Sequence, residues 1–288
     1  GGVGGFPGEL VSGQDQASVV GRALGLVDRH GVAMGELTVG GVLEGNVDDV
    51  AIVGATAHCL PVDVEAVDDR PGAVKQPEPT IVAESHDEVA NGKARLPQEI
   101  SPHDAAALPA RQRSNLAAVL VYTAPGIPMI FQGQEVLEDG YFADTDPVDW
   151  TKLTTYAGVQ TLYRDLIRLR RNWYDTTRGL RGNNVNVHHI NDTNKVIAFH
   201  RWQNGGAKDD VIIVCNFANT SYASYNLGFP RGGTWRVRFN SDWNGYSADF
   251  ANTASNDTTA NAGAKDGMGY NGNVGIGPYT IIILSQDI

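Results

Sequence analysis

Two stretches decide the fold: residues 80–93, TIVAESHDEVANGK, and residues 124–135, APGIPMIFQGQE. Each contains a short apolar run that ends in a polar cluster, which is the pattern of a buried strand leading into a loop. Because the carboxyl ends of parallel strands meet at one edge of a sheet, we expect both clusters at the same ligand-facing end. On spacing alone, solvated strand-to-loop turns remain the simpler interpretation of both clusters.

Helical periodicity follows both runs. Residues 110–122 place Leu116, Val119 and Leu120 at helical spacing, and residues 156–172 carry a longer apolar stripe. Arginines near the end of the second stripe suit the negative end of a helix dipole. Strand, helix, strand, helix is the order of parallel α/β architecture. We therefore expect residues 80–180 to form two strand–helix units.

A different pattern begins after Gly179. Six short runs of β-forming residues are separated by turn sequences such as NDTN (191–194) and PRGG (230–233). The runs are 185–190, 195–202, 210–217, 224–229, 234–239 and 279–284. Residues 181–288 are therefore predicted to form an antiparallel all-β domain. Within it, residues 247–277 are rich in Asn, Gly, Thr and Ala and are expected to be a long surface loop.

Residues 1–79 differ in composition from the rest of the chain. All five Trp and all ten Tyr lie after this segment, which consists mostly of Gly, Val, Ala and Asp. It shows no helical stripe of normal length, and few large side chains are present to fill a core. Three interpretations remain open: a small irregular β region, a partly disordered arm, and a sequence that is not the native reading of its gene.

Charge and composition argue against several classes of function. Asp and Glu (33) exceed Lys and Arg (22), for a net charge of −11, which disfavours binding to nucleic acid or to an anionic membrane surface. No apolar run approaches the roughly 20 residues of a membrane span. Two cysteines, Cys59 and Cys215, are too few for a disulfide framework or a Cys-only zinc site. The first ten residues lack a secretory signal pattern, and we expect a cytoplasmic protein.

The two motifs together resemble the α-amylase superfamily of retaining glycoside hydrolases and transglycosylases (glycoside hydrolase family 13). IVAESHDEVANGKARLPQEI (81–100), then APGIPMIFQGQE (124–135) and DPVDW (146–150), are similar to the family's segments at barrel strands seven and eight. Within the superfamily, ESHDEVANGK is most similar to 1,4-α-glucan branching enzymes. The resemblance implies an α/β fold: the C-terminal part of a (β/α)8 barrel, strands seven and eight, followed by the family's antiparallel all-β C-terminal domain.

The resemblance also implies roles for individual residues. His86 is expected to hydrogen-bond sugar hydroxyls where the glucan is cleaved. Asp87 is expected to be the carboxylate that stabilises the oxocarbenium-like transition state without forming a covalent bond. The residues expected to line the entrance of the cleft are Glu88, Asn91 and Lys93. The residues expected to support the site from strand eight are Gln132, Gly133 and Glu135.

A retaining glycosidase needs a nucleophile and a general acid as well, about 5–5.5 Å apart. In the resembled family the nucleophile lies in a G-F-R-x-D motif upstream of the His-Asp pair, and residues 1–79 contain no such motif. A (β/α)8 barrel takes about 250 residues, and fewer than 80 precede the first motif. We therefore expect an incomplete chain that is inactive alone.

The predicted function is transfer of α-1,4-glucan chains to form α-1,6 branches, with an α-glucan such as glycogen or starch as the partner. Two alternatives stay open: an α-amylase-type hydrolase of starch or glycogen, and a non-catalytic glucan-binding module. No cofactor is expected, and no metal, since the family's usual calcium ligands lie upstream of the matching residues. Neither a nucleic acid nor a membrane is expected as a partner.

The remaining candidates are weaker. His188 and His189 alternate along a predicted strand, so we expect them on opposite faces of the sheet and exposed, rather than in a metal cluster with His200. Trp243, in the turn sequence SDWNGY, is the tryptophan best placed to stack on a sugar. Cys215 lies in a buried run and is expected to be a small core hydrophobe.

Overall fold

The computed structural model describes residues 79–90 and 93–288. The unusual segment at residues 1–79 therefore lies almost entirely outside the described residues, and so does Asn91. The three interpretations of that segment stay predictions.

Residues 79–181 form a helical part around two short strands. β1 (Thr80–Ile81) pairs in parallel with β2 (Ile127–Pro128). The two long helices are α4 (Leu108–Thr123) and α6 (Ala157–Arg170), which confirms both helix predictions. The connections contain α2 (His86–Ala90), α3 (Leu96–Ile100), η1 (Gln134–Val136), α5 (Lys152–Thr155) and η2 (Arg178–Arg181).

Both parallel strands are shorter than the sequence predicts. The apolar runs at 80–85 and 127–131 contribute only two residues each to the ladder, because in the described part of the chain each strand has a single neighbour. Two strands without a third give little independent stability. After Ile81 the chain leaves the ladder and enters α2 within five residues.

Residues 184–285 form the predicted antiparallel all-β domain, which the structure confirms. Eight strands form one sheet in the order β3-β4-β5-β10-β7-β8-β9-β6. Their bounds are β3 (Asn184–Asn191), β4 (Val196–Trp202), β5 (Val211–Asn216), β6 (Tyr222–Phe229), β7 (Gly233–Asn240), β8 (Thr258–Lys265), β9 (Met268–Ile276) and β10 (Thr280–Ser285).

The prediction of a surface loop at residues 247–277 is wrong for most of that range, because β8 and β9 lie within it. Their inward positions carry few large apolar residues, and their outward positions are mainly Asn, Gly and Ala, so the sequence shows little apolar alternation. Side-chain amides bind across this part of the sheet: Asn226 Nδ2 donates to the side-chain oxygens of Asn271, at 3.2 Å, and Asn273, at 3.0 Å.

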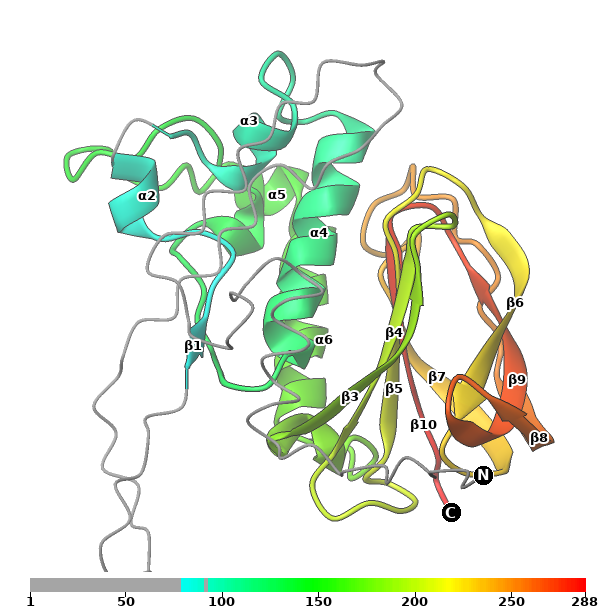
Figure 1. Ribbon diagram of the computed structural model, residues 1–288. Helices are drawn as coiled ribbons and strands as arrows, with labels where there is room; N and C mark the ends of the chain where they lie inside the picture. The colour runs from blue at the N-terminus through cyan, green and yellow to red at the C-terminus, as the bar shows by residue number, and fades with distance from the viewer. Residues whose placement is uncertain (1–78, 91–92) are drawn as a thin grey trace, which may run out of the picture.

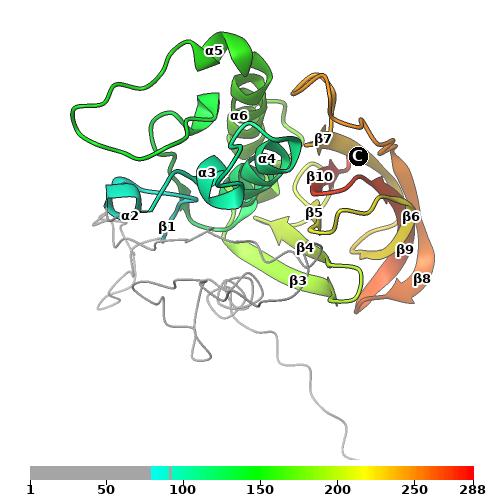
Figure 2. The same ribbon diagram turned by 90° about the horizontal axis from the view of Figure 1, so that it is seen from above.

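The sheet separates two hydrophobic cores. One face of β4, β5 and β10 packs against α4 and α6 and buries residues such as Phe199, Ile213 and Ile281. The opposite face packs against β6 and β9 (Figures 1 and 2), with Leu227 and Trp235 among the buried residues. Cys215 is fully buried in the first core, as predicted. The β domain thus supports the helical part through a continuous apolar contact.

The prediction that His188 and His189 are exposed is wrong. The pairing of β3 with β4 shifts between Val187 and His189, and such a bulge breaks the simple alternation of side chains. His189 is largely buried, with Nδ1 at 3.2 Å from Asp266 and Nε2 at 3.0 Å from the Tyr225 hydroxyl. Both ring nitrogens of His188 are buried as well. These histidines are part of the interior of the β domain.

Two arginines fix the turn from α4 into β2. Arg201, fully buried on β4, donates to the backbone carbonyls of Thr123 and Gly182. Arg170, at the end of α6, donates to the Ala124 carbonyl at 2.7 Å and to the Gly126 carbonyl. Burial lowers the pKa of Arg201 well below its ordinary value. The β domain and α6 therefore determine where β2 begins.

Candidate functional site

The parallel pairing of β1 and β2 directs both sequence motifs toward one end of the helical part. Since the two strands run in the same direction, the chain leaves β1 toward α2 and leaves β2 toward η1 at the same end. Gly126 allows the close approach: its φ is 115°, and a Cβ there would lie 2.4 Å from the Pro79 carbonyl oxygen. Ile127 N then donates to that same carbonyl at 2.9 Å.

His86 and Asp87 are the first two residues of α2. His86 Nε2 lies 3.0 Å from Asp87 Oδ1, and the two side chains are 64% and 61% exposed. The sequence predicted a strand-to-loop turn here, whereas the structure has a short helix directly after the buried Ser85. An imidazole and a carboxylate at an accessible position offer donors and acceptors to a polar ligand.

The remaining residues predicted at the cleft entrance lie on or after α2. Glu88 is the third residue of α2. Lys93 is exposed and begins the described chain again after Asn91, which lies outside the described residues. The structure therefore places His86, Asp87, Glu88 and Lys93 within one short segment.

An ion pair that sequence reasoning missed lies directly behind this segment. Arg95 Nη1 is 2.8 Å from Glu84 Oε1, and the two side chains are 3% and 6% exposed. Glu84 Oε2 also accepts the Leu96 N–H at 2.7 Å. Only Ser85 separates Glu84 from His86, so the pair holds the chain just before α2. A charged residue within the apolar run TIVAES was the only sequence signal for it.

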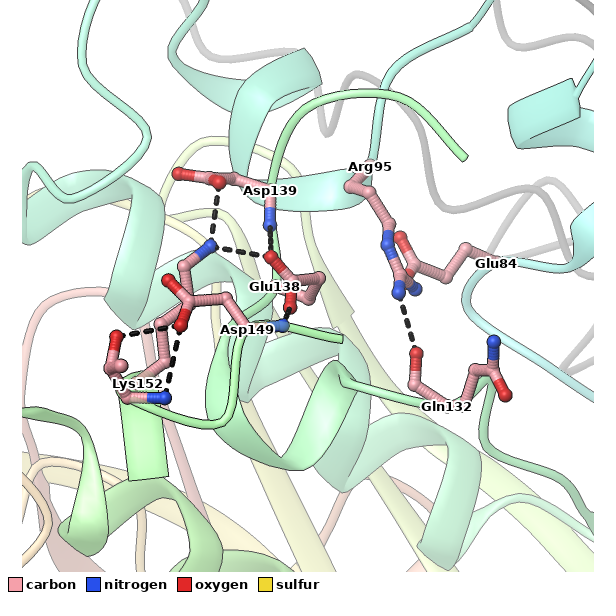
Figure 3. A network of polar contacts seen from close by, with 8 residues as sticks. Glu84, Arg95, Gln132, Glu138, Asp139, Asp149 and Lys152 are labelled. Carbon is pink, nitrogen blue, oxygen red and sulfur yellow. Dashed lines mark hydrogen bonds and ion pairs between the residues drawn. The ribbon is translucent and has the colours of Figure 1, made fainter. Parts of the chain in front are cut away.

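Arg95 also joins this segment to the turn after β2. Its Nη2 donates to the Gln132 carbonyl at 2.5 Å, and its guanidinium lies 4.4 Å from the centre of the Phe131 ring. In Figure 3 the guanidinium lies between Glu84 and the Gln132 carbonyl. The backbone N–H of Arg95 donates to Gly140 O at 2.7 Å. One buried side chain therefore connects both motifs.

The turn at Gln132, Gly133 and Glu135 is shaped by this contact. Gly133 has a φ of 93°, and a Cβ there would lie 2.9 Å from Arg95 Nη2, so a side chain at this position conflicts with both backbone and neighbour. The Gly133 N–H donates to Glu135 Oε2 at 3.0 Å. Gln132 contributes its backbone carbonyl to the contact with Arg95.

A second polar network, also not predicted, closes the base of the loop that follows. Lys152 Nζ lies 2.7 Å from Glu138 Oε1 and 2.6 Å from Asp139 Oδ1. Glu138 Oε2 accepts the Asp149 N–H at 2.7 Å, as drawn in Figure 3. Burial alone would lower the pKa of Lys152, but the hydrogen bonds to Asp139 and Glu138 outweigh it and raise the pKa. The ammonium therefore stays charged and holds both ends of the loop.

Other features of the described residues bear on ligands. Within residues 79–90 and 93–288, no group of three or more His, Cys, Asp or Glu side chains is placed to hold a metal ion. Among the same residues, no helix is long and apolar enough to cross a bilayer. Trp243 is partly exposed, with its ring 5.0 Å from that of Tyr246, and its contact with a sugar stays a prediction.

Comparison with known proteins agrees with the prediction of a C-terminal β domain. Residues 187–287 match the family described as "Alpha amylase, C-terminal all-beta domain". The strands β3 to β10 are therefore the C-terminal β domain of an α-amylase-type protein. The similarity to the α-amylase superfamily that the motifs at residues 80–93 and 124–135 predicted is confirmed by this match.

Similarity to individual proteins covers a limited part of each. The chain is 31% identical over 169 residues to the 1,4-alpha-glucan branching enzyme GlgB of Corynebacterium diphtheriae, which is 55% of this chain and 22% of that protein. It is 29% identical over 201 residues to the GlgB of Prochlorococcus marinus, which is 66% of this chain and 24% of that protein. The chain thus spans about a quarter of the length of these relatives.

Among solved structures, the chain is similar to a pullulanase from Anoxybacillus sp. LM18-11 complexed with maltotetraose, with 18% identity and a TM-score of 0.48. The match covers 72% of this chain and 27% of that one. A debranching enzyme from Nostoc punctiforme matches with 19% identity and a TM-score of 0.47, over 72% of this chain and 35% of that one.

Proposed function

We propose that this chain acts on α-1,4-glucans as part of a retaining enzyme, and that it transfers glucan chains to form α-1,6 branches. The proposal rests on one observation above all: β1 and β2 run in parallel and direct the His86–Asp87 pair and the Gln132–Glu135 turn to the same end. The names of the relatives from C. diphtheriae and P. marinus favour branching over hydrolysis. A cytoplasmic location remains part of the proposal.

In this proposal β1 and β2 are strands seven and eight of a (β/α)8 barrel, residues 80–180 are its last two strand–helix units, and residues 181–288 are a separate β domain. The carboxyl ends of barrel strands carry the active site in this architecture. The accessible position of α2 at that end of β1 supports the assignment.

The proposed roles follow from the chemistry of the transition state. Cleavage of a glycosidic bond develops positive charge on the sugar ring, and a carboxylate held in place lowers the energy of that charge. Asp87 has this role, and His86 donates a hydrogen bond to a hydroxyl of the same sugar. The residues that contact neighbouring sugars are Glu88, Asn91 and Lys93. The residues that hold the strand-eight turn are Gln132, Gly133 and Glu135.

Turnover requires a nucleophile and a general acid in addition to Asp87. Since the sequence contains no G-F-R-x-D motif, the chain alone binds glucan and does not cleave it. Glu84 is not a substitute for either group, because it is buried against Arg95.

The test is migration of the whole chain through a native gel that contains glycogen. Wild-type protein should be retarded, and His86→Ala and Asp87→Asn should each restore much of the mobility. Asp192→Asn is the matched control, because Asp192 is an exposed carboxylate that binds Lys195 in the β domain. Absence of retardation, or equal retardation of all four proteins, would contradict the proposal.

Two assays on the same samples separate the possible reactions. Loss of iodine colour without new reducing ends indicates chain transfer, and release of reducing ends indicates hydrolysis. We expect neither from the chain alone. Hydrolysis by the purified chain would overturn the assignment to branching, and either activity would show that the missing carboxylates are present after all.

A further inference from the structure

The loop from Asp139 to Trp150 presents two aromatic side chains to solvent. Tyr141 and Trp150 are 68% and 62% exposed. By contrast, Phe142 in the same loop packs edge-on against Phe131, with 5.2 Å between the ring centres. The loop thus turns one ring inward and leaves two uncovered within the part of the chain that the structure describes.

Both exposed rings lie next to backbone positions that are fixed by polar contacts. Tyr141 follows Gly140, whose carbonyl accepts the Arg95 N–H at 2.7 Å. Trp150 follows Asp149, whose N–H donates to Glu138 at 2.7 Å and whose carboxylate accepts the Thr151 hydroxyl at 2.6 Å. Since the attachment points are held, a ligand that stacks on these rings orders little additional backbone.

The loop lies at the same end of the helical part as α2, which begins with His86 and Asp87. Figure 1 shows the loop extending beside α2, and in the view from above it remains on that side of the molecule (Figure 2). Arg95 links the two segments directly, because it binds Glu84 before α2 and Gly140 at the start of the loop.

We propose that Tyr141 and Trp150 form an aromatic binding platform for an α-glucan chain, in addition to the residues assigned above. The inference rests on the proposed function, which supplies the class of ligand. A pyranose ring has an apolar C–H face that packs on an aromatic ring and a rim of hydroxyl groups that needs polar partners. The residues between Tyr141 and Trp150 in the sequence can supply the polar partners: they include the exposed side chains of Asp144, Thr145 and Asp146.

The surroundings of the rings favour a saccharide over a protein partner. A protein interface needs a contiguous apolar centre, whereas the loop sequence between Tyr141 and Trp150 is mainly polar or small, with Ala143, Asp144, Thr145 and Asp146 exposed. An extended sugar chain needs isolated stacking surfaces separated by polar groups, and the loop carries two exposed rings with exposed polar residues between them in the sequence.

The experiment titrates the whole chain with maltoheptaose and measures the dissociation constant. Tyr141→Ala and Trp150→Ala should each weaken binding by about fivefold, the effect of losing one aromatic contact. Tyr174→Ala and Trp173→Ala are the matched controls, since these side chains are 56% and 66% exposed on the turn after α6. They should bind as the wild type does.

A further variant reports on the site itself. Trp150→Phe keeps a ring, so its affinity should stay within about twofold of wild type. The part of the change in tryptophan fluorescence on adding maltoheptaose that comes from position 150 should nevertheless disappear. Circular dichroism of each variant establishes that it is folded.

The outcomes separate this proposal from the proposed function. Loss of affinity in His86→Ala with full affinity in Tyr141→Ala and Trp150→Ala would overturn the platform and leave the proposed function standing. The reverse result would keep the platform and overturn the roles of His86 and Asp87. Equal weakening by the control variants, or no binding by the wild type, would overturn the platform.

Discussion

Replacing Arg95 by Met removes a buried, charged side chain that joins the two motifs, and the structure sets the size of the effect. Arg95 and Glu84 are almost completely buried, and breaking such a pair by removing one partner costs about 3–5 kcal/mol, because the remaining charge stays buried without its partner. Glu84 would keep the Leu96 N–H as a hydrogen-bond donor, so we expect a cost near the lower end of this range. The Gln132 carbonyl would also lose a donor, which adds about 1 kcal/mol.

We therefore expect Arg95→Met to lower the free energy of unfolding of the helical part by about 3–4 kcal/mol. Urea unfolding followed by far-ultraviolet circular dichroism measures the change. Arg178→Met is the control, because Arg178 forms an exposed pair with Asp175 at 3.4 Å, and solvent screening makes the loss of such a pair almost neutral.

The double variant Glu84→Gln/Arg95→Met distinguishes a buried charge from lost packing. If the cost arises from the unpaired carboxylate, the double variant should be more stable than Arg95→Met alone, with a coupling of about 1–3 kcal/mol. A loss below about 1 kcal/mol in Arg95→Met would refute the reasoning. So would additive effects of the two substitutions, since they would show no energetic link between the groups.

Three other changes have defined outcomes. Gly133→Ala should destabilise the chain by about 1–3 kcal/mol, because φ is 93° and the added Cβ would lie 2.8 Å from Glu138 Cβ; a lower thermal midpoint in scanning fluorimetry checks this, and an unchanged midpoint contradicts it. Lys152→Met should speed amide exchange in residues 138–150, since it releases Glu138 and Asp139; equal exchange rates would mean that the loop does not depend on this ammonium. Burial lowers the pKa of His188 to about 4 from 6.5, so the unfolded chain takes up a proton between these values and the native chain does not. The free energy of unfolding should therefore fall by about 1.4 kcal/mol per pH unit from pH 6.5 toward pH 4. Urea titrations at pH 7.5, 6.0 and 5.0 measure this slope, and His188→Leu should remove the part that comes from His188. An unchanged slope in the variant would exclude His188 as its source. The side chains that act electrostatically on His188 are His189, His200 and Asp266, and they are the same in both proteins.

Periodicity was a sufficient guide where each element has a strong apolar face. The stripe at residues 156–172 became α6, and the continuous apolar run at 210–217 became β5, whose strand residues are all buried. These elements contribute to the core between the helices and the sheet, so their pattern carries most of the information about their packing.

The sequence was a poor guide where packing comes from small or polar residues. β8 and β9 are rich in Asn, Gly and Ala, so they lack the alternation that marks a half-buried strand. The bulge before His189 shifts the register by one residue, which no local pattern announces. β1 and β2 ended early because ladder length depends on neighbouring strands and not on the apolar run itself.

Sequence reasoning found only part of the candidate site, because the rest depends on contacts between distant segments. His86 and Asp87 follow an apolar run at a strand end, and the family resemblance of the motif around them, rather than this local signal alone, selected them. Arg95 and Glu84 are eleven positions apart, and the third member of their contact, Gln132, lies another 37 positions away. A contact of this kind depends on how β1 and β2 pair, so it becomes visible only in three dimensions.

Hydrogen exchange of the whole chain with and without maltoheptaose tests the central claim most directly. The account predicts slower exchange on glucan binding in residues 84–96 and 131–150, and little change in β6, β8 and β9. Slower exchange confined to the β domain, with residues 84–96 and 131–150 unaffected, would show that the saccharide binds elsewhere and would contradict the account.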